Sequence, residues 1–251
     1  MSQRDSEASS QGGPTASDGG VVQIHRAALR GVDFRKARFQ QFDLGGSLFE
    51  RCEFRGLRID KRFAPMLVAT PRNTFRDCHF DGADLRRTHL GQSRFERCTF
   101  DDALLEGCHA ETAEFVDCRF AGPIDGVTFH GVPPSTERLD PPRKRNEFRG
   151  NDFRDADIDD IVFVGWIDLH AQRWPDDEIY VNVDNFRRRL GKARAEVKDW
   201  YERDRGPALA MLDHLAKRWR DQDHVFTRRW SARVAAPDRV QARVWELLEH
   251  A

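Results

Sequence analysis

The sequence predicts a solenoid repeat protein that ends in a mainly helical module. Large apolar residues recur every five positions through three stretches of the chain, and small residues stand two positions before them. After Phe163 the period stops and the composition changes, because all six Trp and both Tyr of the chain come later. The chain therefore divides into one periodic unit and one aperiodic unit.

Residues 1–22 are predicted to form a disordered tail. They are rich in Ser and Gly and lack the apolar segment of a secretory signal. The 251-residue chain has a net charge of −1 and a pI of 6.8, so its overall charge attracts neither nucleic acid nor an anionic membrane. It has no run of about eighteen apolar residues, so we expect no membrane helix and a cytoplasmic protein.

Residues 23–165 are predicted to form the periodic unit. Its large apolar centres are Leu29, Phe34, Phe39, Leu44, Phe49, Phe54, Ile59, Phe75, Phe80, Leu85, Leu90, Phe95, Phe100, Leu105, Ala110, Phe115, Phe120, Phe148, Phe153, Ile158 and Phe163. The five cysteines are Cys52, Cys78, Cys98, Cys108 and Cys118, and all of them occupy the small-residue position. That position elsewhere takes Ala, Ser, Thr or Val, so we interpret the cysteines as small buried side chains. A metal site is disfavoured because zinc-type Cys and His spacings are missing.

The periodic unit resembles the pentapeptide-repeat protein family. The segments "VDFRK", "CEFRG", "ADLRR", "CTFDD" and "NDFRD" follow the family pattern of a small residue, a polar residue, Leu or Phe, and two polar or Gly positions. The resemblance covers roughly residues 27–165. It implies an all-β solenoid, a right-handed quadrilateral β-helix with one pentapeptide on each face and four in each coil.

A four-sided coil predicts that residues twenty positions apart stack on neighbouring coils. Phe75, Phe95 and Phe115 have this spacing and are expected to stack. Opposite charges also recur at this spacing, in the expected pairs Arg76–Glu96, Asp77–Arg97, Arg97–Asp117, Arg86–Glu106 and Arg94–Glu114. Asp81 and Asp101 are the exception, because they face each other with the same sign.

Two interruptions are predicted to form loops, near residues 60–72 and 121–147. Both contain prolines and leave the five-residue period, although Phe129 is a candidate for one further unit out of phase. Loops on a solenoid often contact partners, and the alternative is that they are solvated insertions. The candidate partner contacts are Phe63, Met66, Leu67, Arg143, Lys144 and Arg145.

Residues 166–251 are predicted to form the mainly helical C-terminal module. A short strand is expected at "EIYVNV", followed by a first helix that begins after Asp184 and ends at Arg205, Gly206 and Pro207. A second helix follows, and a third begins at Pro237 and Asp238. A module of this kind is expected to cap the open end of the solenoid, and the alternative is homodimerisation or partner binding through an uncovered apolar stripe.

The sequence offers no catalytic, cofactor or metal site, so we do not expect an enzyme. Familiar catalytic and nucleotide-binding motifs are missing. His89 and His109 are twenty positions apart and are expected to stack, but two ligands are too few for a metal site. The acidic "DFRDADIDD" is rejected as a calcium loop, because Asp160 stands where Gly is needed and Trp166 where Glu is needed.

The leading functional hypothesis is a non-enzymatic scaffold that binds a protein partner not identifiable from the sequence. The alternative rests on the family resemblance, since some pentapeptide-repeat proteins imitate duplex DNA and modulate DNA gyrase. Residues 26–62 contain ten basic and five acidic residues, which is the wrong sign for such a mimic, whereas residues 101–125 are suitably acidic. The run Arg187, Arg188 and Arg189 is read as a solvated helix face, so we do not expect direct nucleic-acid binding.

Overall fold

The computed structural model describes residues 20–35, 39–59 and 71–251. The helices of this part of the chain are α1 (Phe186–Val197), α2 (Glu202–Arg218) and α3 (Asp238–His250). Its strands are β1 (Gly20–His25), β2 (Ala28–Arg30), β3 (Phe39–Gly45), β4 (Leu48–Glu50), β5 (Thr74–Arg76), β6 (Arg94–Glu96), β7 (Thr99–Asp101), β8 (His109–Ala110), β9 (Glu114–Val116), β10 (Arg119–Asp125), β11 (Thr128–His130), β12 (Phe148–Arg149), β13 (Asp152–Asp159), β14 (Val162–Val164), β15 (Tyr180–Val183) and β16 (Val225–Arg228).

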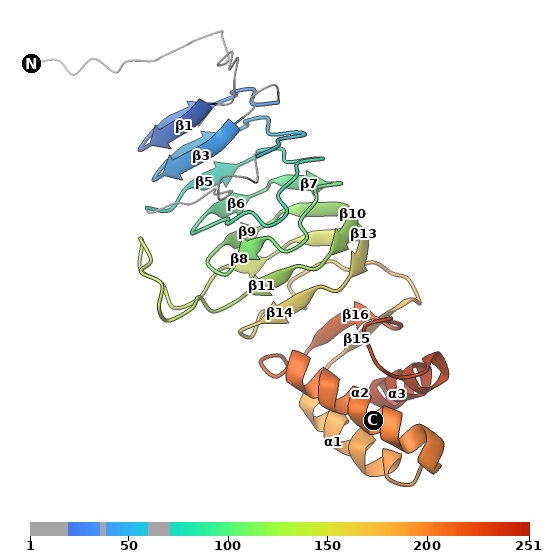
Figure 1. Ribbon diagram of the computed structural model, residues 1–251. Helices are drawn as coiled ribbons and strands as arrows, with labels where there is room; N and C mark the ends of the chain where they lie inside the picture. Colours follow the sequence, from blue (N-terminus) through green and yellow to red (C-terminus); the bar gives the residue numbers. More distant parts are fainter. Residues whose placement is uncertain (1–19, 36–38, 60–70) are drawn as a thin grey trace, which may run out of the picture.

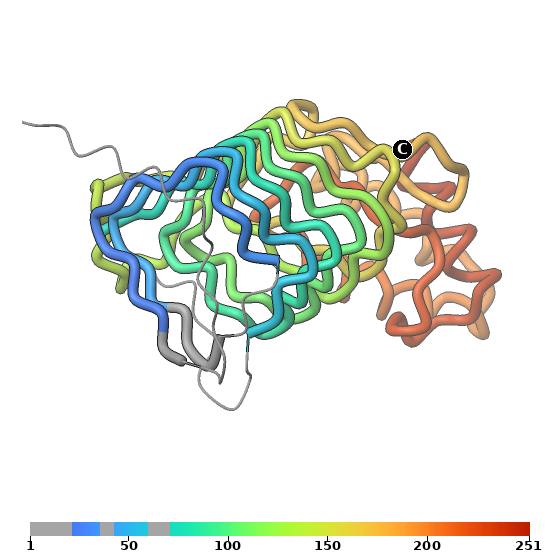
Figure 2. The backbone as a smooth tube through the Cα atoms, turned by 90° about the horizontal axis from the view of Figure 1, so that it is seen from above, coloured from blue at the N-terminus to red at the C-terminus, as the bar shows by residue number. Residues whose placement is uncertain are grey.

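The repeat region is a β-helix of stacked coils with short parallel strands (Figure 1, Figure 2). One sheet has the order β12-β9-β6-β5-β4-β2, and further parallel sheets are β13-β10-β7, β14-β11-β8 and β1-β3. Repeat centres pair with repeat centres, as when Phe95 aligns with Phe75 on one side and Phe115 on the other. The predicted twenty-residue register is therefore observed for these three residues.

The coils turn where the backbone enters the left-handed region two residues after a repeat centre. Asp77 follows Phe75 with φ of 53°, and Gly82 follows Phe80 with φ of 63°. Glycine adopts this conformation without steric cost, and aspartate tolerates it better than most residues do. The polar and Gly positions at the end of each repeat are thus the residues that allow the chain to turn.

Stacked phenylalanine rings fill the inside of the coils. The centroid distances are 4.8 Å between Phe49 and Phe75, 5.0 Å between Phe75 and Phe95, and 5.1 Å between Phe95 and Phe115. These values match the spacing of about 4.8 Å between neighbouring strands, so each ring lies directly on the next. A second column meets the first edge to face, as between Phe75 and Phe80 at 77°.

The five cysteines lie in the small-residue position and are buried and free of disulfides. Four of the thiols lie against backbone carbonyl oxygens of the preceding coil, those of Cys52, Cys78, Cys98 and Cys118. Cys98 Sγ donates to Phe75 O and Cys118 Sγ donates to Phe95 O, each at 3.4 Å. The thiols therefore act as small side chains with a weak donor, as the sequence indicates.

The structure moves the boundary of the second predicted loop. Residues 121–130 continue the coil, because β10 extends to Asp125 and Phe129 of β11 aligns with Ala110 and Phe163. This coil has one residue fewer than the usual twenty, because Phe129 lies nineteen positions after its aligned residue Ala110. A strict five-residue count therefore does not find it. The excursion itself is residues 131–147. Of the first predicted loop, residues 60–70 lie outside the described residues.

The β-helix continues past Phe163 and passes directly into the C-terminal module. Trp174 stacks on Phe153 at 5.1 Å and on Phe226 of β16 at 4.4 Å, so one column of rings crosses the boundary. Beyond this column, β15 pairs with β16 in an antiparallel sheet beside the three helices (Figure 1). The module therefore covers the C-terminal end of the coils.

One helix boundary in the module differs from the prediction. The segment of Arg205, Gly206 and Pro207 was expected to end the first helix, but it lies inside α2, which begins at Glu202. Pro207 is the sixth residue of α2, so it removes one backbone bond near the helix end without dividing the helix. The described helices include none that is long and apolar enough to cross a bilayer.

Candidate interaction surfaces

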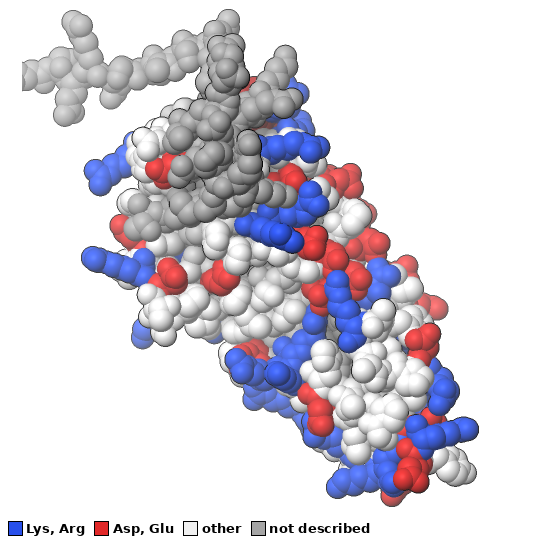
Figure 3. Space-filling model, viewed as in Figure 1, with Lys and Arg blue, Asp and Glu red and all other residues white. Residues whose placement is uncertain are grey.

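The outer surface of the β-helix carries charged side chains that pair across neighbouring coils. Arg76 Nε lies 2.9 Å from Glu96 Oε2, and Arg97 Nε lies 2.7 Å from Asp77 Oδ1, as the register predicts. Arg86 was expected to face Glu106, but it bonds Asp84 of its own repeat. Figure 3 shows the resulting mixture of acidic and basic side chains on one face of the coils. The carboxylates of Asp77, Asp84 and Glu96 are thus each paired with an arginine.

The predicted like-charge contact between Asp81 and Asp101 is relieved by asymmetric surroundings. Asp81 accepts hydrogen bonds from Thr99 Oγ1 and Arg55 Nε, and these bonds outweigh its burial and lower its pKa. Burial raises the pKa of Asp101, although Arg119 lies 2.7 Å away and opposes this shift. The surroundings therefore shift the two pKa values in opposite directions, down for Asp81 and up for Asp101.

The excursion of residues 131–147 lies over the outside of the six-stranded sheet. Gln92 holds it there, because its amide nitrogen donates to Arg138 O at 2.9 Å and its oxygen accepts from Asp140 N at 2.7 Å. Arg72 N also donates to Asp140 O at 2.9 Å. The excursion is consequently bonded to the coil surface.

A groove of about 720 Å³ lies between this excursion and the sheet. Its charged lining residues are Arg72, Arg94, Arg143, Arg145, Arg149, Glu114, Glu147 and Asp168. We call it the arginine groove, since its lining has five arginines against three carboxylates. Trp166 also lines it and leaves 46% of its surface exposed, so the groove offers an aromatic face beside positive charge.

Buried Glu114 lies at the base of the arginine groove. Its Oε2 is 2.7 Å from Arg72 and 3.5 Å from Arg94, and its Oε1 accepts from Glu147 N at 3.0 Å. Burial alone lowers the pKa of Arg94, but its bonds to Glu96 and Glu147 outweigh that effect and raise it. One buried carboxylate therefore gathers guanidinium groups from separate coils.

The predicted contact residues have different surroundings. Phe63, Met66 and Leu67 lie outside the described residues. Lys144 is exposed, and Arg145 donates to Gly165 O at 3.2 Å.

Arg143 points inward, with only 11% of its side chain exposed, and donates to Thr112 O. Burial lowers its pKa, and its Nη1 has no hydrogen-bond partner among the residues that the structure describes. Sequence reasoning missed Arg72 and Arg149 as members of this groove. These two arginines line the same groove as Arg143 because the excursion of residues 131–147 folds back over the coils.

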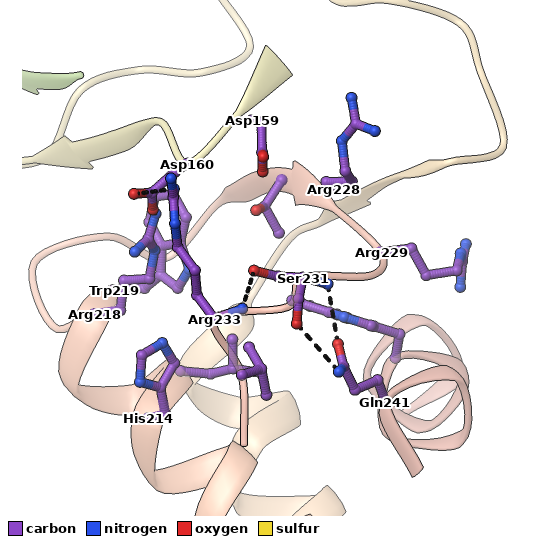
Figure 4. Close-up of a pocket in the computed structure, with 14 residues that line it drawn as sticks. Asp159, Asp160, His214, Arg218, Trp219, Arg228, Arg229, Ser231, Arg233 and Gln241 are labelled. Atoms are coloured by element: carbon purple, nitrogen blue, oxygen red, sulfur yellow. Dashed lines mark hydrogen bonds and ion pairs between the residues drawn. The ribbon is translucent and has the colours of Figure 1, made fainter. Parts of the chain in front are cut away.

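A second pocket, of about 210 Å³, lies where the module meets the last coils (Figure 4). Arg218 and Arg233 both contact the carboxylate of Asp160, and Arg233 also reaches Asp125 at 3.1 Å. Ser231 and Gln241 bond each other on the opposite wall. The charged groups of this pocket bind one another across the boundary, so the pocket joins the two parts of the molecule.

Four of the nine histidines form two stacked or near-stacked pairs. His89 and His109 stack at 4.0 Å with an angle of 6° between the rings, as their spacing predicts. His170 and His224 lie 4.1 Å apart beside Asp184, and these three side chains are the one group in the described part of the chain with metal-ligand geometry.

Comparison with known proteins identifies the repeats. The family model described as pentapeptide repeats (9 copies) matches residues 75–119. No curated protein matches the chain. Solved structures that match include two trypsin-treated forms of QnrB1, described as a plasmid-mediated fluoroquinolone resistance protein.

The first of these structures is 16% identical and covers 61% of this chain and 69% of its own, with a TM-score of 0.28. The second is 14% identical and covers 63% of this chain and 80% of its own, with a TM-score of 0.26. The residues of the family match form the central coils of the β-helix, with Phe75, Phe95 and Phe115 stacked inside them. Residues 75–119 therefore consist of pentapeptide repeats.

Proposed function

We propose that this chain is a non-enzymatic scaffold that binds a protein partner through its outer surface. The described repeat interior is filled by phenylalanine rings such as Phe80 and Phe100, whose centroids lie 5.2 Å apart. A filled coil offers no internal cleft for convergent catalytic groups. The parallel pairings support the right-handed, four-sided coil that the family resemblance implies.

The arginine groove is the proposed contact surface. The observation that carries this proposal is Nη1 of Arg143, which has no hydrogen-bond partner in the described part of the chain, although Nε of the same side chain lies 3.5 Å from Glu114 Oε1. A buried guanidinium N–H without an acceptor costs free energy, and a carboxylate placed there would recover it. Arg145 and Arg149 extend the positive lining toward solvent, and exposed Trp166 adds an apolar face. The partner segment that fits this chemistry is acidic, with an apolar residue nearby.

Binding of an acidic probe tests this proposal. We expect a labelled poly-glutamate peptide to bind the full chain in fluorescence anisotropy, with affinity falling as salt rises. Arg149→Glu reverses an exposed lining charge and should weaken binding at least tenfold. Arg154→Glu is the matched control, because Arg154 is equally exposed but bonds Asp152 outside the groove. Equal binding by both variants would contradict the groove as the contact surface.

DNA mimicry of the kind that modulates DNA gyrase is the second candidate function. It requires rows of unpaired carboxylates, whereas Glu50, Asp77 and Glu96 each bond an arginine. These pairs favour the scaffold over the mimic. A supercoiling assay with purified gyrase separates the two, because we expect micromolar protein to leave the reaction unchanged. Inhibition or protection of gyrase, competed by duplex DNA, would establish the mimic instead.

A further inference from the structure

Three side chains from separate segments converge where the last coil meets the module. His170 belongs to the coil segment that precedes Trp174, Asp184 follows β15, and His224 precedes β16. His170 Nε2 lies 2.9 Å from Asp184 Oδ1, and His224 Nδ1 lies 3.7 Å from the same oxygen. The ligand atoms of all three residues lie within 4.8 Å of one another.

The surroundings of His224 leave one ring nitrogen available as a ligand. Its Nε2 bonds Asn182 Oδ1, and an amide oxygen only accepts, so Nε2 carries the proton. Its Nδ1 then has a free lone pair, is buried, and lacks a hydrogen-bond partner among the described residues. Only 10% of the side chain is exposed, so water reaches it poorly. A buried lone pair that faces a carboxylate oxygen is unfavourable unless a cation lies between them.

We propose that His170 Nε2, Asp184 Oδ1 and His224 Nδ1 bind a divalent cation of the zinc class. Tetrahedral zinc with N and O ligands at about 2.0–2.2 Å holds its ligand atoms roughly 3.3 Å apart. The observed 2.9 Å and 3.7 Å lie on either side of that value, so small side-chain rotations complete the site. The bond from His224 Nε2 to Asn182 Oδ1 fixes the orientation of the ring, as metal-bound histidines commonly do by donating their other ring N–H to an oxygen.

The ligand set also predicts selectivity and a structural role. Two imidazoles and one carboxylate suit zinc or cobalt, whereas magnesium and calcium prefer oxygen ligands alone. The side chain of His170 is 66% exposed, which leaves a coordination position for water. The cation joins the last coil to both strands of the β15–β16 sheet, so binding should stabilise the boundary.

Zinc titration of the chelator-stripped full chain tests the site. We expect one equivalent of zinc by calorimetry, a visible ligand-field spectrum with cobalt, and a rise in Tm with zinc. His170→Ala and Asp184→Asn should each weaken zinc binding at this site by at least about tenfold. Loss of a residue that only hydrogen-bonds a metal ligand already weakens metal binding by about that factor. Both residues are substantially exposed, so these variants are expected to fold. Magnesium and calcium should produce neither calorimetric heat nor a Tm shift.

The double variant His89→Ala and His109→Ala is the matched control. Its two rings lie at nearly the same distance as those of His170 and His224. Glu111 pairs with His109 at 3.3 Å, but these three side chains do not form a group with metal-ligand geometry. The five buried cysteines are common to all variants and do not distinguish them. Retained zinc binding in the control, with loss in His170→Ala, supports the site. Zinc binding that survives His170→Ala, disappears in the control, or is lacking in the unmodified chain overturns it.

Discussion

The repeat region and the C-terminal module hold their cores together in different ways. In the repeats, each buried ring contacts rings one coil away, as Phe95 does with Phe75 and Phe115. In the module, Tyr180 of β15 stacks on Phe226 of β16, and these two residues are 46 positions apart in the sequence with no repeat between them. Repeat stability is therefore distributed among similar neighbouring contacts, whereas module stability depends on a few contacts between distant segments.

The chain carries a natural reporter for each region. All five cysteines lie in the repeats between Cys52 and Cys118, and all six tryptophans lie at Trp166 or later. Thiol labelling in urea therefore reports opening of the coils, and tryptophan fluorescence reports unfolding of the module and the last coil. If the two transitions coincide, the two regions unfold together, and if they separate, the regions unfold independently.

The largest expected effect is removal of one ring from the middle of the phenylalanine column. Phe95→Ala should lower the free energy of unfolding by about 3–5 kcal/mol, because Phe95 is fully buried and its neighbours are held by their own strands. Thiol labelling in urea measures the loss. Leu104→Ala is the control, since Leu104 is 44% exposed and should change stability by less than about 0.5 kcal/mol. Similar effects in the two variants would contradict a core built from stacked rings.

A smaller effect is expected at the boundary between the regions. Asp160→Asn keeps the left-handed backbone at this position but removes the charge that Arg218 and Arg233 share. We expect a loss of about 1.5–3 kcal/mol, typical of hydrogen bonds to charged groups. The thiol and fluorescence transitions should also separate. Asp155→Asn is the control, because Asp155 is 68% exposed and its loss should leave the transitions together.

The periodic part of the fold could be predicted from the sequence residue by residue. A repeat centre such as Phe95 and a small position such as Cys98 are defined by counting, and the register then places Arg76 against Glu96. Within the described residues, the count failed where the coil changes length, as at Phe129, and where the coil continues past Phe163 to Arg173. Local spacing is enough here because every contact repeats the one before it.

The candidate sites could not be predicted in the same way. Arg143 was identified as a contact, but its inward position depends on how the excursion folds back on Thr112. His170 and His224 are 54 positions apart and meet only because β15 pairs with β16, a pairing that leaves no periodic signal. Contacts of this kind come from tertiary packing, which a single sequence does not encode as a local pattern.

Alkaline pH should destabilise the repeats by a moderate amount. Burial raises the pKa of Cys108 to about 12, whereas an unfolded thiol titrates near 9.0. The unfolded chain therefore loses protons first, and stability that is intact below pH 9.0 falls as the pH rises toward 12. Each such thiol contributes a slope of up to about 1.4 kcal/mol per pH unit.

Urea unfolding between about pH 8 and 9.5 measures this slope below the range where tyrosine titrates. Cys108→Ala is the matched variant, because alanine already occupies the same repeat position at Ala103 and Ala113. It should show a shallower decline than the unmodified chain. An unchanged slope would mean that the thiol is not protected from solvent in the folded coil.

The smallest expected effect comes from a single ion pair on the coil surface. Asp77 and Arg97 bond at 2.7 Å on adjacent coils, and the bond to Arg97 lowers the pKa of Asp77. Both side chains are well exposed, so solvent and salt screen their attraction. A double-mutant cycle with Asp77→Asn and Arg97→Gln should give a coupling of about 0.2–1 kcal/mol that shrinks in high salt. A coupling above this range would mean that surface pairs, and not the stacked rings alone, hold neighbouring coils together.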